Sequence, residues 1–154
     1  LLNQENTWVL GKKKIYPENI YRLVGGGIEP GESVEVTAQR ELEEELGIAL
    51  KLDEFTQILQ VNATFSEYKT GEIVNHTTNV CFAKISSEVT IAPADDLDGV
   101  VHLSDDEYLD LVDRFLAIPS ELMQEPGGFR WIDYGKYYAM VHREARLQAR
   151  LLKL

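Results

Sequence analysis

The sequence predicts an α+β fold, and three observations lead to this prediction. Apolar side chains recur at every fourth position from residue 34 to residue 46, which is typical of an amphipathic helix. The runs 55–65 and 73–85 are rich in β-branched and aromatic residues, which favour strands. A length of 154 residues with 44% hydrophobic residues is sufficient for one compact core. We therefore expect a single domain over residues 1–154 that combines a sheet with helices.

Two short extended segments and a glycine loop are expected in the N-terminal part. Residues 7–10 and 20–24 are predicted strands, and three lysines at positions 12–14 lie between them. The glycines at positions 25–27 allow backbone angles and close approaches that side chains would block. They indicate a tight bend or a ligand-facing loop, with a flexible linker as the alternative.

Two predicted helices have suitable residues at their ends. Ser33 can cap the start of the first helix, and Gly47 can close it in a left-handed conformation. A second helix is expected to follow Ser104, because Ser104 and Glu107 have the spacing of a capping box. This helix should end near residue 117, before a proline. The segment 67–72 is a plausible turn between the two long β-runs.

The chain should close with a basic amphipathic helix over about residues 133–153. From residue 134 onward the sequence has five Lys and Arg side chains and a single acidic one. The apolar residues expected along one side of this helix are Tyr137, Met140, Val141, Leu147, Leu151 and Leu154. This face should pack on the rest of the protein, or else on a second copy of it.

Composition makes several classes of function unattractive. The formal net charge of −11 disfavours binding to nucleic acid or to anionic membranes. No apolar run approaches the roughly 20 residues of a membrane span, and no charged leader precedes an apolar region, so we expect a cytoplasmic protein. The single cysteine, Cys81, lies within a predicted strand and is expected to be a buried thiol rather than a nucleophile.

Three carboxylates are predicted on one face of the first helix. At about 100° per residue, Glu41, Glu44 and Glu45 share an arc of about 100°, whereas Glu43 points away. Like charges at these spacings repel, and divalent cations relieve the repulsion. Oxygen ligands favour Mg²⁺ or Mn²⁺ over zinc. The alternative is an acidic helix face that is simply solvated.

Arg40 and Glu32 strengthen the metal interpretation. Arg40 can reach Glu44 one helical turn away, and Glu32 can reach Arg40 if the preceding loop folds back. A carboxylate that is oriented by an arginine has a more specific role than solubility.

These residues resemble those of the Nudix hydrolase family. The Nudix box has the form G-x5-E-x7-R-E-U-x-E-E-x-G-U, where U is a bulky aliphatic residue. Every specified position is matched in this sequence, by Gly26, Glu32, Arg40, Glu41, Leu42, Glu44, Glu45, Gly47 and Ile48. The resemblance covers 23 residues of the chain, and it implies an α/β/α sandwich around a central mixed β-sheet.

The resemblance also implies roles for the box residues. Glu41, Glu44 and Glu45 would bind Mg²⁺, or Mn²⁺ in its place. Glu44 would be the general base, with metal binding alone as its alternative. Glu32 and Arg40 would hold the loop and the helix together for catalysis.

Outside the carboxylates of the box, the resemblance indicates further candidates for the site. Gly26 and Gly27 would shape the substrate loop. Apart from the resemblance, the basic side chains Lys12, Lys13, Lys14 and Arg22 could steer phosphate toward this loop, with a solvated turn as the alternative for the lysines. Asp96 stands where many relatives have an acidic residue that contacts metal or water. Asp95 and Asp98 are close competitors, and a solvated loop is the alternative.

The implied activity is Mg²⁺-dependent hydrolysis of a diphosphate linkage in a small nucleoside diphosphate derivative. The derivative itself is left open. The proline typical of ADP-ribose hydrolases is replaced by Thr64, and Tyr68 lies slightly later than the tyrosine typical of dinucleoside polyphosphate hydrolases. Tyr68 could stack on a base, with packing or a surface position as the alternative. The alternatives are a non-catalytic nucleotide-sensing domain and an enzyme like isopentenyl diphosphate isomerase, for which Cys81 is weak support. Family members often pair, so a homodimer is possible.

Overall fold

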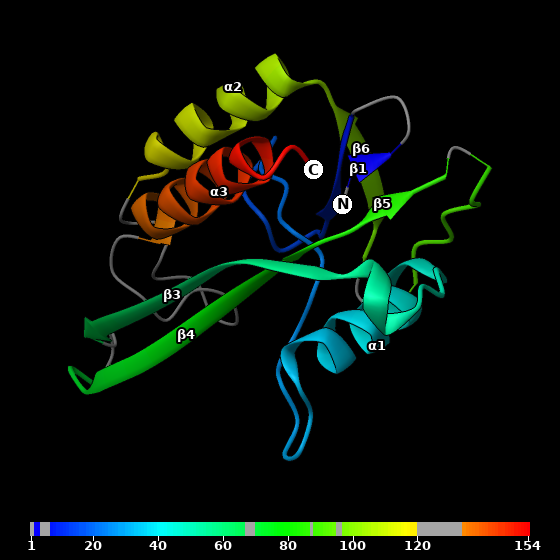
Figure 1. The fold of residues 1–154 in the computed structure, drawn as a ribbon. Coiled ribbons are helices and arrows are strands. Elements are labelled where there is room, and N and C mark those ends of the chain that lie inside the picture. Colours follow the sequence, from blue (N-terminus) through cyan, green and yellow to red (C-terminus); the bar gives the residue numbers. More distant parts are fainter. Residues whose placement is uncertain (1, 4–6, 67–69, 87, 95–96, 120–133) are drawn as a thin grey trace.

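The fold was analysed in a computed structural model, which describes residues 2–3, 7–66, 70–86, 88–94, 97–119 and 134–154. It contains two sheets and three α-helices within these ranges (Figure 1).

A four-stranded sheet has the order β5-β1-β2-β6. Its strands are β1 (Leu2–Asn3), β2 (Trp8–Lys12), β5 (Lys84–Ile85) and β6 (Gly99–Leu103). The pair β2–β6 is antiparallel, with Leu10 opposite Val101, whereas β1 and β5 are parallel. The sheet is therefore mixed, as expected.

A long antiparallel hairpin forms the second sheet. It consists of β3 (Thr56–Ser66) and β4 (Ile73–Phe82), with one irregularity in register between Gln57 and Leu59. The run 73–85 is extended as predicted, but it forms two strands that belong to different sheets. Ala83, which is buried, separates β4 from β5, and at this residue the chain passes from the hairpin to the mixed sheet.

The predicted strand over residues 20–24 was wrong. Arg22 makes an isolated bridge to Gly11, with backbone N–O distances of 2.8 and 3.0 Å in the two directions. Only this residue pair connects the segment to β2, so the segment continues as an irregular loop into the glycines.

The helices begin and end close to the expected residues. In α1 (Val34–Leu46) the Ser33 side chain accepts a hydrogen bond from the Val36 backbone, and Gly47 ends the helix with a φ of 66°. In α2 (Asp105–Leu116) the predicted capping box forms between Ser104 and Glu107. The last helix, α3, spans Tyr134–Leu151, and a short 3₁₀ turn, η1, spans Leu52–Glu54.

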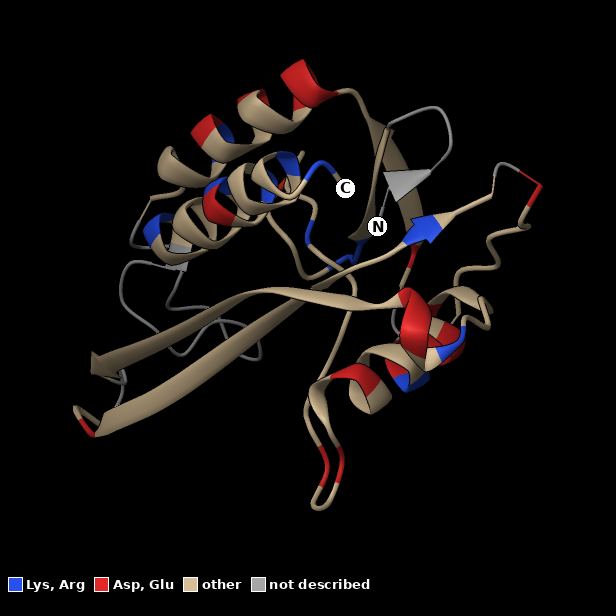
Figure 2. Ribbon diagram, viewed as in Figure 1, with Lys and Arg blue, Asp and Glu red and all other residues tan. Residues whose placement is uncertain are grey.

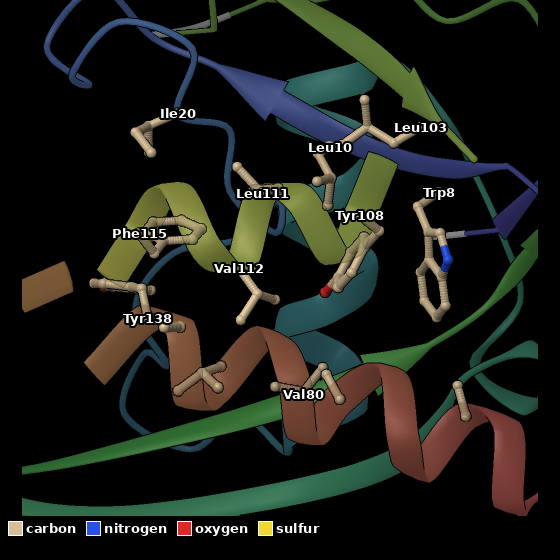
Figure 3. Packing of buried hydrophobic residues seen from close by; sticks show 14 of the residues in the cluster. Trp8, Leu10, Ile20, Val80, Leu103, Tyr108, Leu111, Val112, Phe115 and Tyr138 are labelled. Atoms are coloured by element: carbon tan, nitrogen blue, oxygen red, sulfur yellow. The ribbon is translucent and has the colours of Figure 1, made fainter. Parts of the chain in front are cut away.

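The main core lies where α2 and α3 pack together and against the two sheets (Figures 1 and 3). Tyr108 and Phe115 of α2 are fully buried, and so is Leu10 of β2. The side chain of Trp8 packs against the ring of Tyr108, with centroids 4.7 Å apart. Aromatic contacts of this kind add to the free energy gained from burial alone.

The predicted buried face of α3 was partly wrong. Tyr137 and Val141 are buried as expected, but Leu147 and Leu151 are 44% and 66% exposed. The buried positions toward the end of α3 are Ala145 and Ala149. Ala145 and Ala149 continue the row of Tyr137 and Val141 at four-residue spacing, and Leu147 and Leu151 lie about 200° around the helix from these alanines.

A second cluster of apolar residues positions α1. Leu42 and Leu46 of α1 pack with Val9 of β2 and Ile85 of β5. This contact orients the helix so that its acidic face lies beside the glycine loop. No helix in the described ranges is long and apolar enough to cross a membrane.

Candidate active site

Arg40 connects the loop before α1 to the acidic face of the helix. Its Nε and Nη2 atoms donate to the two oxygens of Glu32, at 2.9 and 3.1 Å. Its Nη1 atom donates to Glu41 at 2.7 Å and to Glu44 at 3.0 Å. Nη2 also donates to the Gly27 carbonyl at 2.9 Å. Both contacts expected for Arg40 are therefore present, and the guanidinium also binds a second helix carboxylate.

Glu32 accepts further hydrogen bonds besides those from Arg40. The Thr37 hydroxyl donates to it at 2.7 Å, and the Glu29 backbone at 3.1 Å. These donors together lower the pKa of Glu32 to about 2, with the largest effect from Arg40 and the next from Thr37. Thr37 was not identified from the sequence, because a buried threonine in a helix has no distinctive pattern. The Glu32 carboxylate stays ionised at any physiological pH.

Gly26 lies directly against the Glu41 carboxylate. A Cβ atom at position 26 would collide with the Glu41 carboxylate, which Arg40 holds in place. Only glycine allows the loop to pass the carboxylate this closely. The role expected for Gly26, to shape the loop, thus has a specific steric cause.

Glu45 points inward, unlike the other two box glutamates of α1. It is 3% exposed, and its carboxylate accepts from the Gly25 backbone at 3.0 Å and from the Lys13 ammonium at 2.9 Å. Lys13 was not singled out for this contact, because within a run of three lysines nothing in the sequence marks the one that turns inward.

Glu44 is the most accessible of the three carboxylates, with a side chain 55% exposed. Glu43 is exposed too, as expected for the opposite side of the helix. Figure 2 shows the acidic residues gathered on α1 and the loop before it. In the described residues no three His, Cys, Asp or Glu side chains converge on one point as metal ligands. The carboxylates bind cations instead: Glu41 and Glu44 accept from Arg40, and Glu45 accepts from Lys13.

A pocket of about 640 Å³ adjoins the box. Its wall includes Gly26, Gly27 and Glu41 of the box, and Tyr138 and His142 of α3. Arg22 also lines it, with the guanidinium 3.9 Å from the centre of the Tyr138 ring and donating to the Tyr138 hydroxyl. The volume is within the usual range for a small-molecule site.

A comparison with family models decides the family. The model described as NUDIX domain matches residues 1–114 of the chain. The chain belongs to the NUDIX domain family. A sequence search of curated proteins gives no significant match.

Solved Nudix structures share the fold. A MutT/nudix family protein from Enterococcus faecalis is 24% identical with a TM-score of 0.50, over 62% of this chain and 36% of that one. An Ap4A hydrolase from C. elegans is 13% identical with a TM-score of 0.54, over 96% of this chain and 88% of that one.

A bifunctional NMN adenylyltransferase/ADP ribose pyrophosphatase from Francisella tularensis, complexed with AMP and a manganese ion, also matches. It is 17% identical with a TM-score of 0.55, over 94% of this chain and 39% of that one. This chain therefore spans well under half the length of the Enterococcus and Francisella proteins. The family match shows that the chain is a Nudix domain, and these neighbours share its α/β/α sandwich fold.

The predicted candidates of this Nudix domain fall into two groups. Around the box and the pocket, the structure brings together Arg22, Gly26, Gly27, Glu32, Arg40, Glu41, Glu44 and Glu45. Asp96, its competitor Asp95, and Tyr68 lie outside the described residues. The other competitor, Asp98, pairs with Lys14 at 3.2 Å.

Cys81 lines the pocket wall but is not activated. The thiol is only half-buried rather than fully buried, and burial, followed by the negative charge of Glu35, raises its pKa to about 11. It therefore remains protonated near neutral pH, which agrees with the expectation that it is not a nucleophile.

Proposed function

We propose that this Nudix domain hydrolyses a diphosphate linkage in a small nucleoside diphosphate derivative, by Mg²⁺-dependent attack of water at phosphorus. The observation that carries the proposal is the Arg40 guanidinium, which binds Glu32, Glu41 and Glu44 beside a pocket large enough for a nucleotide. A solvated acidic helix face would not need such a fixed arrangement.

The donor chemistry of the box fits Mg²⁺, with Mn²⁺ as the alternative. Glu41, Glu44 and Glu45 offer only oxygen ligands, which both ions prefer. Together with Glu32 they give four negative charges, and the two cations that bind them, Arg40 and Lys13, leave a formal −2. One divalent ion would neutralise this charge. When bound, the ion would offset the charge of the diphosphate and activate water.

Glu44 is our candidate for the general base. Its carboxylate is at the surface of the helix, where water can reach it, and Arg40 holds one of its oxygens. The other oxygen can accept a proton from the attacking water. Metal binding alone remains the alternative role for Glu44.

Substrate would be bound by the pocket next to the box. We infer that Gly26 and Gly27 lie along the diphosphate and that Arg22 attracts a phosphate group. Asp96 remains a prediction as a contact to metal or water, and Tyr68 remains a prediction as a contact to a base. A homodimer and a cytoplasmic location likewise remain predictions, and the net charge of −11 does not favour nucleic acid as substrate.

The two alternatives lack the support that hydrolysis has. A non-catalytic sensing domain would not require the complete set of box carboxylates. An enzyme like isopentenyl diphosphate isomerase would require a reactive cysteine, and the thiol of Cys81 has a raised pKa.

Glu44→Gln tests the proposal. Wild-type protein should release phosphorylated products in the presence of Mg²⁺ in a screen of nucleoside triphosphates, nucleotide sugars, ADP-ribose, dinucleoside polyphosphates and capped RNA. The variant should lose about 10²-fold or more in turnover, because it removes a general base or a metal ligand. Glu43→Gln on the opposite side of the helix is the matched control and should keep wild-type turnover. Equal turnover in all three proteins would reject the role of Glu44.

A further inference from the structure

We propose that Lys13 is the counter-ion of the Glu45 carboxylate when no metal is bound, and that its ammonium competes with a divalent ion for this carboxylate. Binding of Mg²⁺ would then release Lys13 from the interior. The inference rests on the proposed role of Glu45 as a metal ligand.

The ion pair between Lys13 and Glu45 is unlike a surface salt bridge. The side chains are 15% and 4% exposed, and the ammonium is 2.9 Å from Glu45 Oε1. The adjacent Lys14, which pairs with Asp98, is 89% exposed. Exposed pairs contribute little to stability, whereas a buried carboxylate depends on its counter-ion. Lys13 therefore has an electrostatic role that Lys14 does not have.

Local backbone structure fixes the inward direction of Lys13. Strand β2 ends at Lys12, whose carbonyl accepts from the Asp98 backbone at 2.8 Å. The Lys13 carbonyl then accepts from the Tyr16 backbone at 3.0 Å, in a turn. Lys12 at the end of β2 and Lys14 in the turn are exposed, whereas the side chain of Lys13 between them is only 15% exposed.

Lys13 binds one of the two Glu45 oxygens that a metal ion could use. Glu45 Oε2 accepts from the Gly25 backbone, and Oε1 accepts from Lys13. A divalent ion that binds Oε1 would lie close to the ammonium, and two cations repel at such a distance in a poorly hydrated site. A lysine side chain has four flexible methylenes, so it can move toward solvent when the ion displaces it.

Lysine labelling of the wild-type protein tests this directly. Reductive methylation at each lysine is measured by mass spectrometry, with and without saturating Mg²⁺. We expect labelling of Lys13 to increase several-fold with Mg²⁺ and labelling of Lys14 to stay constant. Unchanged or reduced labelling of Lys13, while calorimetry shows that Mg²⁺ is bound, would overturn the inference and leave the proposed hydrolysis intact. If calorimetry shows no binding of Mg²⁺ or Mn²⁺, the proposed metal role fails first.

Variants give a second, independent measurement. Lys13→Met removes the competing cation, so its affinity for Mg²⁺ in calorimetry should rise about tenfold, within the roughly 5–150-fold usual for coupled sites. Lys13→Arg keeps the charge and Lys14→Met changes only an exposed lysine, so neither should bind Mg²⁺ more tightly. A lysine with only a structural role would affect stability without tightening metal binding. A Mg²⁺ affinity of Lys13→Met that is equal to or weaker than that of the wild type would contradict the proposal. If Lys13→Met does not fold, the labelling experiment on the wild type decides.

Discussion

Arg40 is the residue on which the local geometry of the box depends. A guanidinium has several donors in one plane, and here they bind three carboxylates and one backbone carbonyl at once. The contacts raise the pKa of Arg40, chiefly through Glu32 and then Glu41, so it is charged at every accessible pH. Lysine offers a point charge with no fixed plane and could not orient Glu32, Glu41 and Glu44 together.

Arg40→Lys should therefore lower turnover without unfolding the protein. We expect a loss of at least about tenfold in kcat, because the glutamates are no longer held in their catalytic arrangement. Circular dichroism should show unchanged helix content, since α1 is anchored by Leu42 and Leu46 on its other side. A variant with wild-type kcat would show that the guanidinium geometry is dispensable.

The pKa of Glu32 gives a separate test of the same contacts. Its folded pKa of about 2 lies below the ordinary 4.5, so its contribution to stability is present above pH 4.5 and is lost as the pH falls through about 2. In an NMR titration the Glu32 carboxyl carbon should titrate near pH 2 in the wild type. In Arg40→Met the midpoint should move toward 4.5. A wild-type midpoint already near 4.5 would contradict the arrangement.

At the scale of elements, Asp105 joins α2, α3 and β2. It lies in the first turn of α2, accepts from Trp8 Nε1 at 3.3 Å and from Arg146 Nε at 2.8 Å, and pairs with Arg150. Partial burial acts to raise its pKa, but the hydrogen bonds from Arg146 and Trp8 outweigh burial and lower it. The basic end of α3 thus packs on the acidic start of α2, which favours the intramolecular role predicted for this helix.

Asp105→Asn should destabilise the packing of these helices. The change keeps the shape but removes the charge that Arg146 and Arg150 bind, and we expect the free energy of unfolding to fall by about 1–3 kcal/mol in urea denaturation. Asp106→Asn, at an exposed position in the same helical turn, is the control and should change it by less than about 0.5 kcal/mol. Equal effects of the two variants would show that the ion pairs contribute nothing specific.

For the whole molecule, His142 is the buried group that links stability to pH. It is fully buried between the rings of Tyr108 and Phe115, and neither of its ring nitrogens has a hydrogen-bond partner among the described residues. Burial, followed by the charge of Arg22, lowers its pKa to about 3 from the ordinary 6.5. Between these two pH values the unfolded chain binds a proton that the folded protein excludes.

The stability of the protein should therefore fall as the pH is lowered from 6.5 toward 3. One such proton contributes at most about 1.4 kcal/mol per pH unit, or about 2 kcal/mol between pH 6.5 and pH 5. His142→Leu removes this contribution. The free energy of unfolding of the variant minus that of the wild type should therefore be more positive at pH 5 than at pH 7. Urea denaturation at the two pH values measures the difference. Parallel pH dependences of the two proteins would contradict the burial of an uncharged imidazole.

Much of the fold and part of the site follow from local rules in the sequence. The ends of α1 and α2 were predicted because capping depends on a few neighbouring residues such as Ser33, Gly47 and Ser104. The contacts of Arg40 with Glu44 and Glu32 were predicted for a similar reason, since helical spacing and a short loop bring them together. The box glutamates share one helix, so their neighbourhood is determined by the helix itself.

Only the tertiary structure decided which side chains turn inward. Lys13 reaches Glu45 because β2 packs beside α1, and nothing in three consecutive lysines distinguishes the middle one. The break at Ala83 depends on two sheets competing for one β-forming run. Ala145 faces the core in line with Tyr137 and Val141 along α3, whereas Leu147 lies on another side of the helix and is exposed. Periodicity determines that a helix forms, whereas the volume available between packed elements determines which of its faces is buried.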